Sequence, residues 1–410
     1  MIVLEILSVL FATAAVFGLV SARWLRLPVT IGTMLLTVVA SAALTLTAGF
    51  VPTLHHDAQA LLGHIDFGSV VLHGMLPLLL FAGAFLLDLA QLRREKLAIA
   101  LFSTAGTGLS FILVAALMAL LSGGHIPWME CLVFGALVSP TDPIAVLEML
   151  RHIGISKRIE AQLAGESLFN DGLGAVLFIT MLSLAAGHTP TPLAVAGSLV
   201  AKAGGGILLG IAAAWITSHL MRRVDAYTVD ILFSAALALG GYALAEALHL
   251  SAPLEAVIAG IALRQFNCGV PDERIAHGKI DEFWKVIDEI QNSILFVLMG
   301  FEAMSIPLTA VTWRAGLTSI LAVNLVRLAV VAVLLTLVRL IRRGHSSSVF
   351  VLTWGGLRGG LSIALALSVP EALGRSWIVG ATYILVVFSI VVQGSSMQRL
   401  LRRSAAHKAA

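Results

Sequence analysis

The feature that most constrains this sequence is its division into apolar runs of about 20 residues along nearly all of its 410 positions. A helix of that length crosses the roughly 30 Å hydrocarbon core of a bilayer. A transmembrane β-barrel would instead show alternating segments of about 10 residues, a pattern that this sequence lacks. The sequence therefore predicts an all-α polytopic membrane protein.

Composition narrows the functional classes in the same direction. Hydrophobic residues make up 59% of the chain and charged residues 12%, about half of the roughly 25% that is typical of soluble domains. These fractions exclude a soluble globular enzyme and a disordered chain. The net charge of +3 does not indicate nucleic acid binding, because the basic residues stand at the ends of apolar runs. Membrane lipid is the expected surrounding, and no nucleic acid partner is expected.

Thirteen apolar segments can be counted, and each is expected to be a transmembrane helix. They cover residues 2–22, 27–48, 68–88, 97–122, 129–150, 159–186, 193–218, 228–249, 251–267, 284–304, 313–338, 348–370 and 376–397. Most of the 26 Lys and Arg fall into alternate connections, such as Arg93 with Arg94 and Arg222 with Arg223. Loops rich in Lys and Arg stay in the cytoplasm. We therefore expect an outside N-terminus and a cytoplasmic C-terminus in a plasma (inner) membrane.

The thirteen segments divide into six, one and six, and this division predicts an inverted-topology repeat. An even number of helices plus one linker reverses the second half relative to the first, as in many secondary transporters. The expected units are residues 1–186 as the first six-helix repeat, 187–227 as a linker helix, and 228–410 as the second repeat with a short cytoplasmic tail.

The fifth segment of each half, segments five and twelve of the chain, contains residues that break helices. VSPTDPIAV places Pro140 and Pro143 three residues apart, and WGGLRGGLS carries four glycines between positions 355 and 360. Proline removes a backbone donor, and glycine weakens a helix entropically. Broken crossing helices at corresponding positions of two repeats indicate a binding site near the middle of the membrane. Two ordinary kinks, which are common in membrane helices, are the alternative.

Ionisable side chains inside these segments are concentrated in segments five and six. Asp142 stands beside Thr141 in the proline-broken stretch. The stretch GESLFNDGLG adds four polar residues on one broad helix face: Glu166, Ser167, Asn170 and Asp171. Charges in hydrocarbon are costly and usually mark function. Carboxylates, a hydroxyl, an amide and freed carbonyls are hard oxygen ligands, which suit a small alkali cation better than zinc or copper.

A carboxylate held away from water binds either a proton or a cation, but not both favourably. This competition is the simplest basis for cation/proton exchange, and it requires no cofactor. An oxygen-lined site can be sized for Na⁺ or for K⁺, so K⁺/H⁺ exchange is the alternative within this class. A passive channel is disfavoured by the inverted broken helices. An intramembrane hydrolase using Ser167 and Asp171 is the remote alternative, since no histidine is near either residue in sequence and no GxSxG motif surrounds the serine.

Two arginines inside apolar segments bear on this site. Arg327 is one of the few buried cations able to pair with Glu166, so Glu166 is interpreted mainly as a structural partner and only secondly as an ion ligand. Arg358 lies in the glycine-broken helix, where it either offsets carboxylates near the helix crossing or is a packing charge.

Three further charged residues lie inside segments, away from this cluster in the sequence. Lys202 has no evident acidic partner and is expected to extend its amine toward the membrane surface. Glu246 and Glu255 flank a tight turn, HLSAP, between the eighth and ninth segments. Lining of an ion funnel and a structural role both stay open for these two acids, and the structural role is favoured.

Assembled in order, these motifs resemble one family, the monovalent cation:proton antiporters, and within it the NhaP-type sodium/proton exchangers related to the animal exchangers. The matching stretches span nearly the whole chain. They are LFAGAFLLDLAQLRR from Leu80, SPTDPIAV from Ser139, GESLFNDG from Gly165, YALAEALHLS from Tyr242, FWKVIDEIQNSILFVLMGFE from Phe283 and WGGLRGGLSIALALSVP from Trp354. Together, TDP, ESLFNDG and GGLRGG in this order and spacing are highly specific.

The resemblance implies a core domain of helices four to six and eleven to thirteen, a dimerisation domain of the remaining helices, and elevator-like transport by a homodimer. It implies that Asp171 is the main carboxylate that binds Na⁺, Li⁺ or H⁺, completed by Asp142, Thr141 and Ser167. In this family, an asparagine at the position of Asn170 accompanies electroneutral one-for-one exchange. Glu166 would pair with Arg327, and Arg358 matches the arginine of the glycine-rich twelfth helix.

Overall fold

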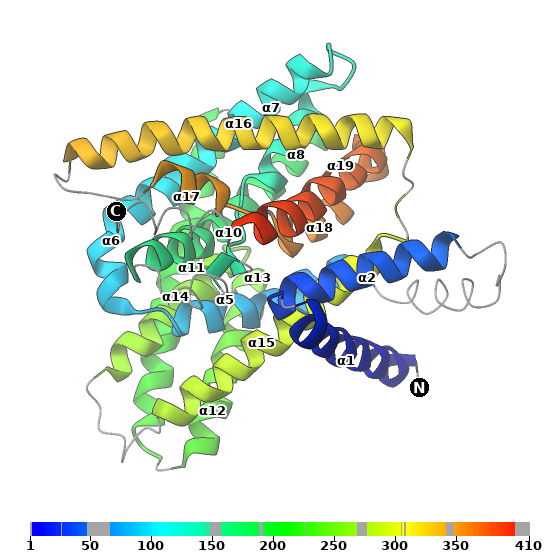
Figure 1. Cartoon of the computed structure of the whole chain (residues 1–410). Coiled ribbons are helices and arrows are strands. Elements are labelled where there is room, and N and C mark those ends of the chain that lie inside the picture. The colour runs from blue at the N-terminus through cyan, green and yellow to red at the C-terminus, as the bar shows by residue number, and fades with distance from the viewer. Residues whose placement is uncertain are drawn as a thin grey trace, which may run out of the picture.

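The computed structural model describes most of the chain, and Figure 1 traces the remaining residues in grey. The described ranges are 2–25, 27–46, 66–144, 146–147, 157–187, 192–224, 226–268, 277–304, 306, 309–341 and 348–397. The expected tail after residue 397 and parts of several expected loops lie outside these ranges.

Each of the thirteen expected segments overlaps helix in the described residues. The first half contains α1 (Ile2–Val20), η1 (Ser21–Leu25), α2 (Val29–Leu46), α4 (Phe67–Ser69), η2 (Val70–Met75), α5 (Leu76–Phe85), α6 (Leu89–Leu101), η3 (Phe102–Gly106), α7 (Thr107–Leu121), α8 (Trp128–Val138) and α10 (Lys157–Ala185). The η labels mark π-helical turns that continue the neighbouring helices, except for η5, which is a 3₁₀ turn.

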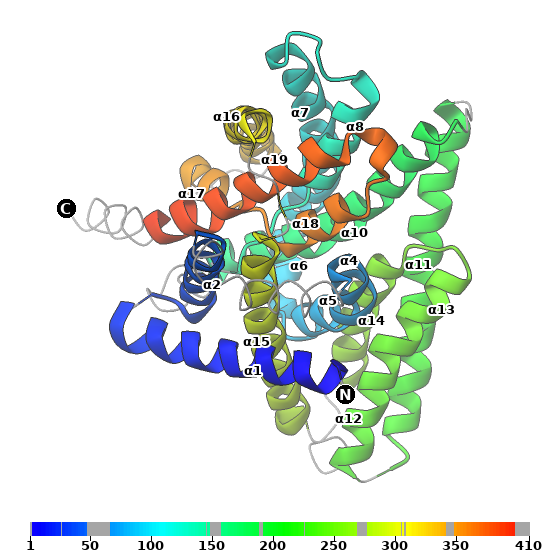
Figure 2. The ribbon, with the colours of Figure 1, turned by 90° about the vertical axis from the view of Figure 1, so that its right-hand side faces the viewer.

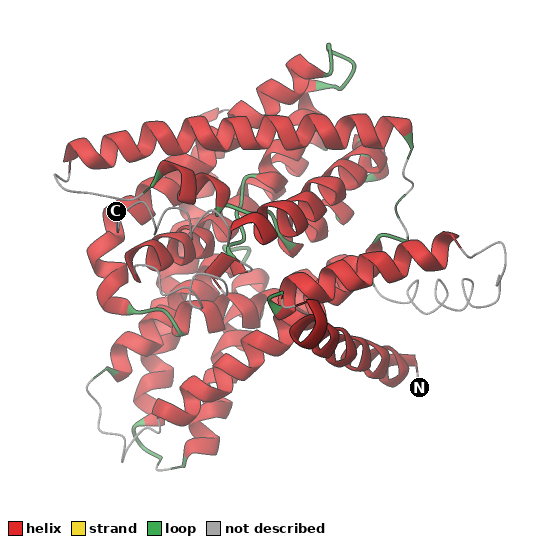
Figure 3. Ribbon diagram, in the orientation of Figure 1, coloured by secondary structure: helices red, strands yellow, loops and turns green. Residues whose placement is uncertain are grey.

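The second half continues in the same way. It contains α11 (Pro192–Met221), α12 (Tyr227–Ala236), η4 (Leu237–Gly241), α13 (Tyr242–Ala247), α14 (Ala252–Asn267), α15 (His277–Glu302), α16 (Ala310–Ile341), α17 (Val349–Trp354), α18 (Gly360–Leu367), η5 (Glu371–Leu373), α19 (Arg375–Val387) and η6 (Phe388–Gly394). Within the described ranges no strand occurs (Figure 3), and nine helical spans are long and apolar enough to cross a membrane. The all-α membrane fold is confirmed, while the count of thirteen and the inverted repeat stay predictions.

Two helices begin seven or eight residues earlier than their apolar segments predict. The segment expected from residue 97 begins at Leu89, where the Asp88 carboxylate accepts hydrogen bonds from the backbone N–H groups of Ala90 (2.9 Å) and Gln91 (3.2 Å). The segment expected from residue 284 begins at His277. Hydropathy marks the apolar part of a helix, whereas a helix begins where its first N–H groups find an acceptor.

The helices form two groups that meet around α10. One group packs α6, α7, α8 and α10 with α16, α17, α18 and α19. The other packs α1, α2, α5 and α11 with α12, α13, α14 and α15. Figures 1 and 2 show these groups on opposite sides of the molecule, with α10 and α18 near its centre.

Both helices expected to be broken are interrupted at the predicted residues. α8 ends at Val138, and the chain is not helical again until Ile144; α17 ends at Trp354, and α18 begins at Gly360. The two breaks touch, because the backbone N–H of Asp142 donates to the carbonyl oxygen of Leu357 at 2.8 Å. Two helix interruptions thus place free backbone groups side by side inside the protein.

Candidate ion-binding site

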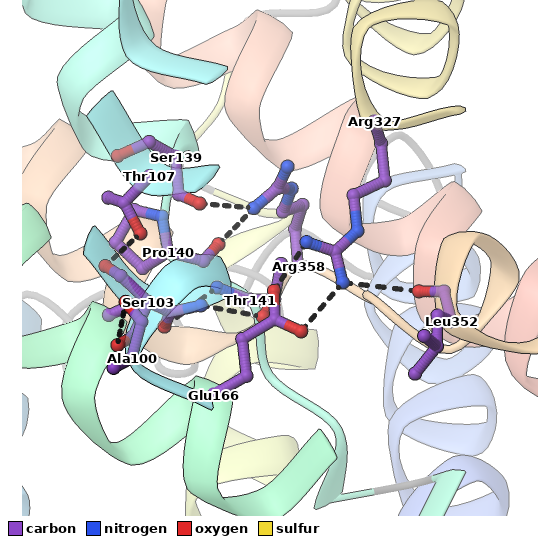
Figure 4. A network of polar contacts seen from close by, with 11 residues as sticks. Ala100, Ser103, Thr107, Ser139, Pro140, Thr141, Glu166, Arg327, Leu352 and Arg358 are labelled. Atoms are coloured by element: carbon purple, nitrogen blue, oxygen red, sulfur yellow. Dashed lines mark hydrogen bonds and ion pairs between the residues drawn. The ribbon is translucent and has the colours of Figure 1, made fainter. Parts of the chain in front are cut away.

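Arg358 joins the two broken helices (Figure 4). Its Nη1 donates to the carbonyl oxygen of Ser139 at 2.7 Å and to that of Pro140. The last carbonyls of a helix have no partner within the helix and carry a partial negative charge. The arginine therefore supplies hydrogen bonds to the carbonyl groups that follow the end of α8, and it brings a buried positive charge to the crossing. This contact agrees with the interpretation of Arg358 as a charge at the helix crossing.

Asn170 of α10 binds the proline break through both ends of its amide. Its oxygen accepts from the backbone N–H of Thr141 at 3.2 Å, and its nitrogen donates to the Thr141 hydroxyl at 2.8 Å. One turn later, Gly174 lies so close to Pro140 that a Cβ at this position would overlap the proline ring. The face of α10 that carries Asn170 and Gly174 is therefore fixed against the break.

The carboxylate of Asp142 lies where the two breaks touch. One oxygen accepts from the backbone N–H of Ile144 at 3.0 Å, and so caps the helical turn that follows the break. The other oxygen lies against Gly359, where an added Cβ would overlap it. A glycine is needed at this position because the carboxylate occupies the space of a side chain.

Asp171 is the carboxylate without a fixed partner. Within the described residues it makes no hydrogen bond or ion pair. It lies near enough to Asp142 and Arg358 for both charges to act on it. Ser167, one turn earlier on the same face of α10, is buried. Asp171 is thus oriented by its helix but left open to a ligand.

Accessibility separates the eight predicted residues into two sets. Only Asp142 and Asp171 are partly exposed. The other six are buried: Thr141, Glu166, Ser167, Asn170, Arg327 and Arg358. The two residues that keep some accessible surface are therefore the two carboxylates that have no cation bonded to them.

Glu166 pairs with Arg327. The ion pair is bidentate, with Arg327 Nη1 on one carboxylate oxygen and Nη2 on the other at 3.1 Å, and Nη2 also donates to the carbonyl oxygen of Leu352 at 3.1 Å. Both side chains are at most 5% exposed. Figure 4 shows the pair between α10 and α16, beside the crossing. Its two charges neutralise each other.

Lys202, Glu246 and Glu255 lie in α11, α13 and α14. Lys202 and Glu246 line a cavity of about 390 Å³ bounded by α10, α11, α13 and α18, in which Glu246 approaches His73 at 3.6 Å. Glu255 does not line this cavity and is fully buried.

Several contacts of the site were not predicted from the sequence. They involve backbone carbonyls (Ser139, Pro140), glycines (Gly174, Gly359) and the Ser362 hydroxyl, which donates to Leu137 O at 2.9 Å. The regular spacing of Glu166, Asn170 and Gly174 on α10 was a usable signal, because residues four apart share a helix face.

Comparisons with known proteins identify the family. Residues 11–403 match the family model described as "Sodium/hydrogen exchanger, transmembrane". The chain is 38% identical to the Na(+)/H(+) antiporter NhaP of Pseudomonas aeruginosa, over 98% of this chain and 96% of the relative. It is 30% identical to the Na(+)/H(+) antiporter NhaH of Halobacillus dabanensis, over 82% and 83% of the two chains.

A solved structure supports the fold. The sodium proton antiporter MjNhaP1 of Methanocaldococcus jannaschii superposes with a TM-score of 0.72 over 98% of both chains, at 21% sequence identity. The family match and the NhaP match cover the whole region that carries the broken helices and their carboxylates. The chain therefore belongs to the sodium/hydrogen exchanger family.

Proposed function

We propose that this protein exchanges Na⁺ for H⁺ across the membrane, with the two ions competing for Asp171. The observation that carries this proposal is the pair of partly exposed carboxylates, Asp142 and Asp171, at the contact of two broken helices. Thr141 and Ser167 supply hydroxyl oxygens to the same region. Oxygen ligands of this kind suit an alkali cation, and Li⁺ is expected to be accepted as well. The relatives are named antiporters, which supports transport over the hydrolase alternative.

A charge count supports one-for-one, electroneutral exchange. Glu166 and Arg327 neutralise each other. Arg358, whose charge acts on Asp171, balances one of the two carboxylates Asp142 and Asp171. One net negative charge remains, and either one Na⁺ or one H⁺ neutralises it. The neutral Asn170 adds no further charge, since its amide is engaged by Thr141.

The two helix groups supply a basis for alternating access. We assign the group that contains the broken helices as the moving core, and the group of α1, α2, α5 and α11 to α15 as the dimerisation side of a homodimer. The groups meet where Gly172 of α10 lies against Leu254 of α14, and a Cβ on this glycine would lie 2.8 Å from Leu254 Cδ2. Small residues at such a contact permit an elevator-like displacement of one packed group against the other.

The test is exchange by purified protein in proteoliposomes with a pH-sensitive dye inside. Addition of Na⁺ to acid-loaded vesicles should restore the dye signal, Li⁺ should do the same, and Asp171→Asn should abolish both. Glu289→Gln, which changes an exposed acid on α15, is the matched control and should retain full exchange. A response to K⁺ but none to Na⁺ would instead assign K⁺/H⁺ exchange, and undiminished exchange by Asp171→Asn would remove Asp171 from the mechanism.

A further inference from the structure

Glu255 is a buried acid that the proposed exchange does not use. Its side chain is 0% exposed, and neither carboxyl oxygen has a hydrogen-bond partner among the described residues. An ionised carboxylate in such a place loses its hydration and gains nothing in return, which is among the most unfavourable arrangements in a protein interior. A protonated carboxyl is neutral and far less unfavourable there.

Two glycines of neighbouring elements lie against Glu255. Its carboxyl group lies against Gly241 at the end of η4, where a Cβ would overlap it. The backbone of the same residue lies against α11, where a Cβ on Gly210 would lie 2.7 Å from the carbonyl oxygen of Glu255. The carboxyl group therefore lies against η4, while the backbone of Glu255 packs closely on α11.

No cation on the neighbouring helices offsets this carboxyl. The helices packed against α14 are α5, α10, α11, α13 and η4. Their titratable residues are Lys157, Arg158, Glu160, Glu166, Asp171, Lys202, His219, Tyr242 and Glu246, and none of them is a hydrogen-bond or ion-pair partner of Glu255. Arg264 of α14 itself pairs with Asp281 instead. Because the described residues supply no charge that offsets Glu255, a bound proton makes its burial favourable.

We propose that Glu255 is a second proton-binding site of this protein, separate from Asp142 and Asp171. It carries a proton in the packed arrangement, and loss of that proton loosens α14 from η4 and α11. The neighbouring residue, Leu254, rests on Gly172, next to Asp171. A change in the packing of α14 therefore reaches the transport site. The assignment stands whether or not the proposed exchange is correct, because its test measures packing and not transport.

Thermal unfolding of the purified protein at several pH values tests this assignment. Because the ionised carboxyl has no partner in the packed arrangement and is hydrated in the unfolded chain, loss of the proton favours unfolding, and we expect the wild type to lose stability as the pH rises. Glu255→Gln removes this loss. We expect the melting temperature of the variant minus that of the wild type to grow by several degrees between about pH 5 and about pH 9. For Glu289→Gln, the exposed control, the difference should stay constant with pH.

The amide that Glu255→Gln introduces is buried and could prevent folding, so a second variant and a second measurement are included. Glu255→Met places an apolar side chain of similar length in the site, and it should show the same pH-dependent gain. In the wild type, hydrogen exchange corrected for its intrinsic pH dependence should show α14 losing protection at alkaline pH while α16 keeps it. Melting differences that are constant with pH, or equal protection of α14 and α16 at every pH, would overturn the assignment.

Discussion

At the scale of single residues, the acids of this site have three different environments. Glu166 is held by Arg327, Asp142 is held by the backbone N–H of Ile144, and Asp171 is held by neither a cation nor a donor among the described residues. Binding of a mobile ion requires the last kind of environment, because a carboxylate with a fixed partner has to give that partner up first. This difference supports the proposal that Glu166 has a structural role and that Asp171 binds the ion.

Removal of the Glu166 charge should affect folding before transport. Glu166→Gln leaves Arg327 buried and unpaired, and breaking one side of a buried pair costs about 3–5 kcal/mol. We expect a lower melting temperature and lower yield, and exchange per folded molecule close to that of the wild type. A double variant, Glu166→Gln with Arg327→Met, should recover part of the stability. Unchanged stability with lost exchange would mean that Glu166 is an ion ligand.

Asp142 should contribute to exchange less completely than Asp171. Asp142→Asn keeps an oxygen that can accept from Ile144 N–H, so the break should keep its shape. The site loses one of its two carboxylates, and the positive charge of Arg358 is then balanced by Asp171. We expect exchange to fall strongly but measurably in proteoliposomes, with a weaker apparent affinity for Na⁺. Exchange with wild-type affinity would place Asp142 outside the ion site.

At the scale of elements, the two breaks act as one unit because their backbones bond to each other. The sequence predicted both interruptions correctly. Pro140, Pro143 and the glycines from 355 to 360 destabilise a helix locally, whatever it packs against. The sequence did not predict that Arg358 bonds the carbonyls of Ser139 and Pro140, or that Asn170 holds Thr141. Those partners lie far apart in the chain, and only the packing of α10 and α18 against α8 brings them together.

A substitution that adds one methyl group to α10 tests its contact with the proline break. Gly174→Ala places a Cβ where the Pro140 ring lies, and such overpacking costs typically about 1–3 kcal/mol. We expect a lower melting temperature and reduced exchange, because α10 is displaced from the break that positions Asp142. Gly108→Ala in α7 meets no atom within 4 Å and should leave both unchanged. Equal behaviour of the two variants would show that the break tolerates a displaced α10.

At the scale of the whole molecule, the proposed alternating access requires the two helix groups to move relative to each other. Gly83 of α5 and Leu168 of α10 lie on opposite sides of their boundary, and a Cβ on the glycine would lie 3.3 Å from Leu168 Cδ2. A covalent link here would hold α10 against α5. The division into two groups could not be read from hydropathy, since all of these helices are apolar and their assignment depends on which of them pack together.

A reversible cross-link tests this movement. In a background with Cys268→Ser, the pair Gly83→Cys and Leu168→Cys should stop exchange when oxidised and regain it when reduced. Each single cysteine variant should be insensitive to oxidation. Full exchange by the cross-linked protein would show that α10 and α5 do not separate during transport.

The central claim, that Na⁺ and H⁺ compete for Asp171, is tested most directly by proton release on Na⁺ binding to the purified protein. In a weakly buffered solution, we expect about one proton released per Na⁺ bound, and an apparent Na⁺ affinity that weakens about tenfold per pH unit on the acid side. Asp171→Asn should release none, whereas Glu289→Gln should behave as the wild type. Na⁺ binding that releases no proton, or release that persists in Asp171→Asn, would contradict the competition at this carboxylate.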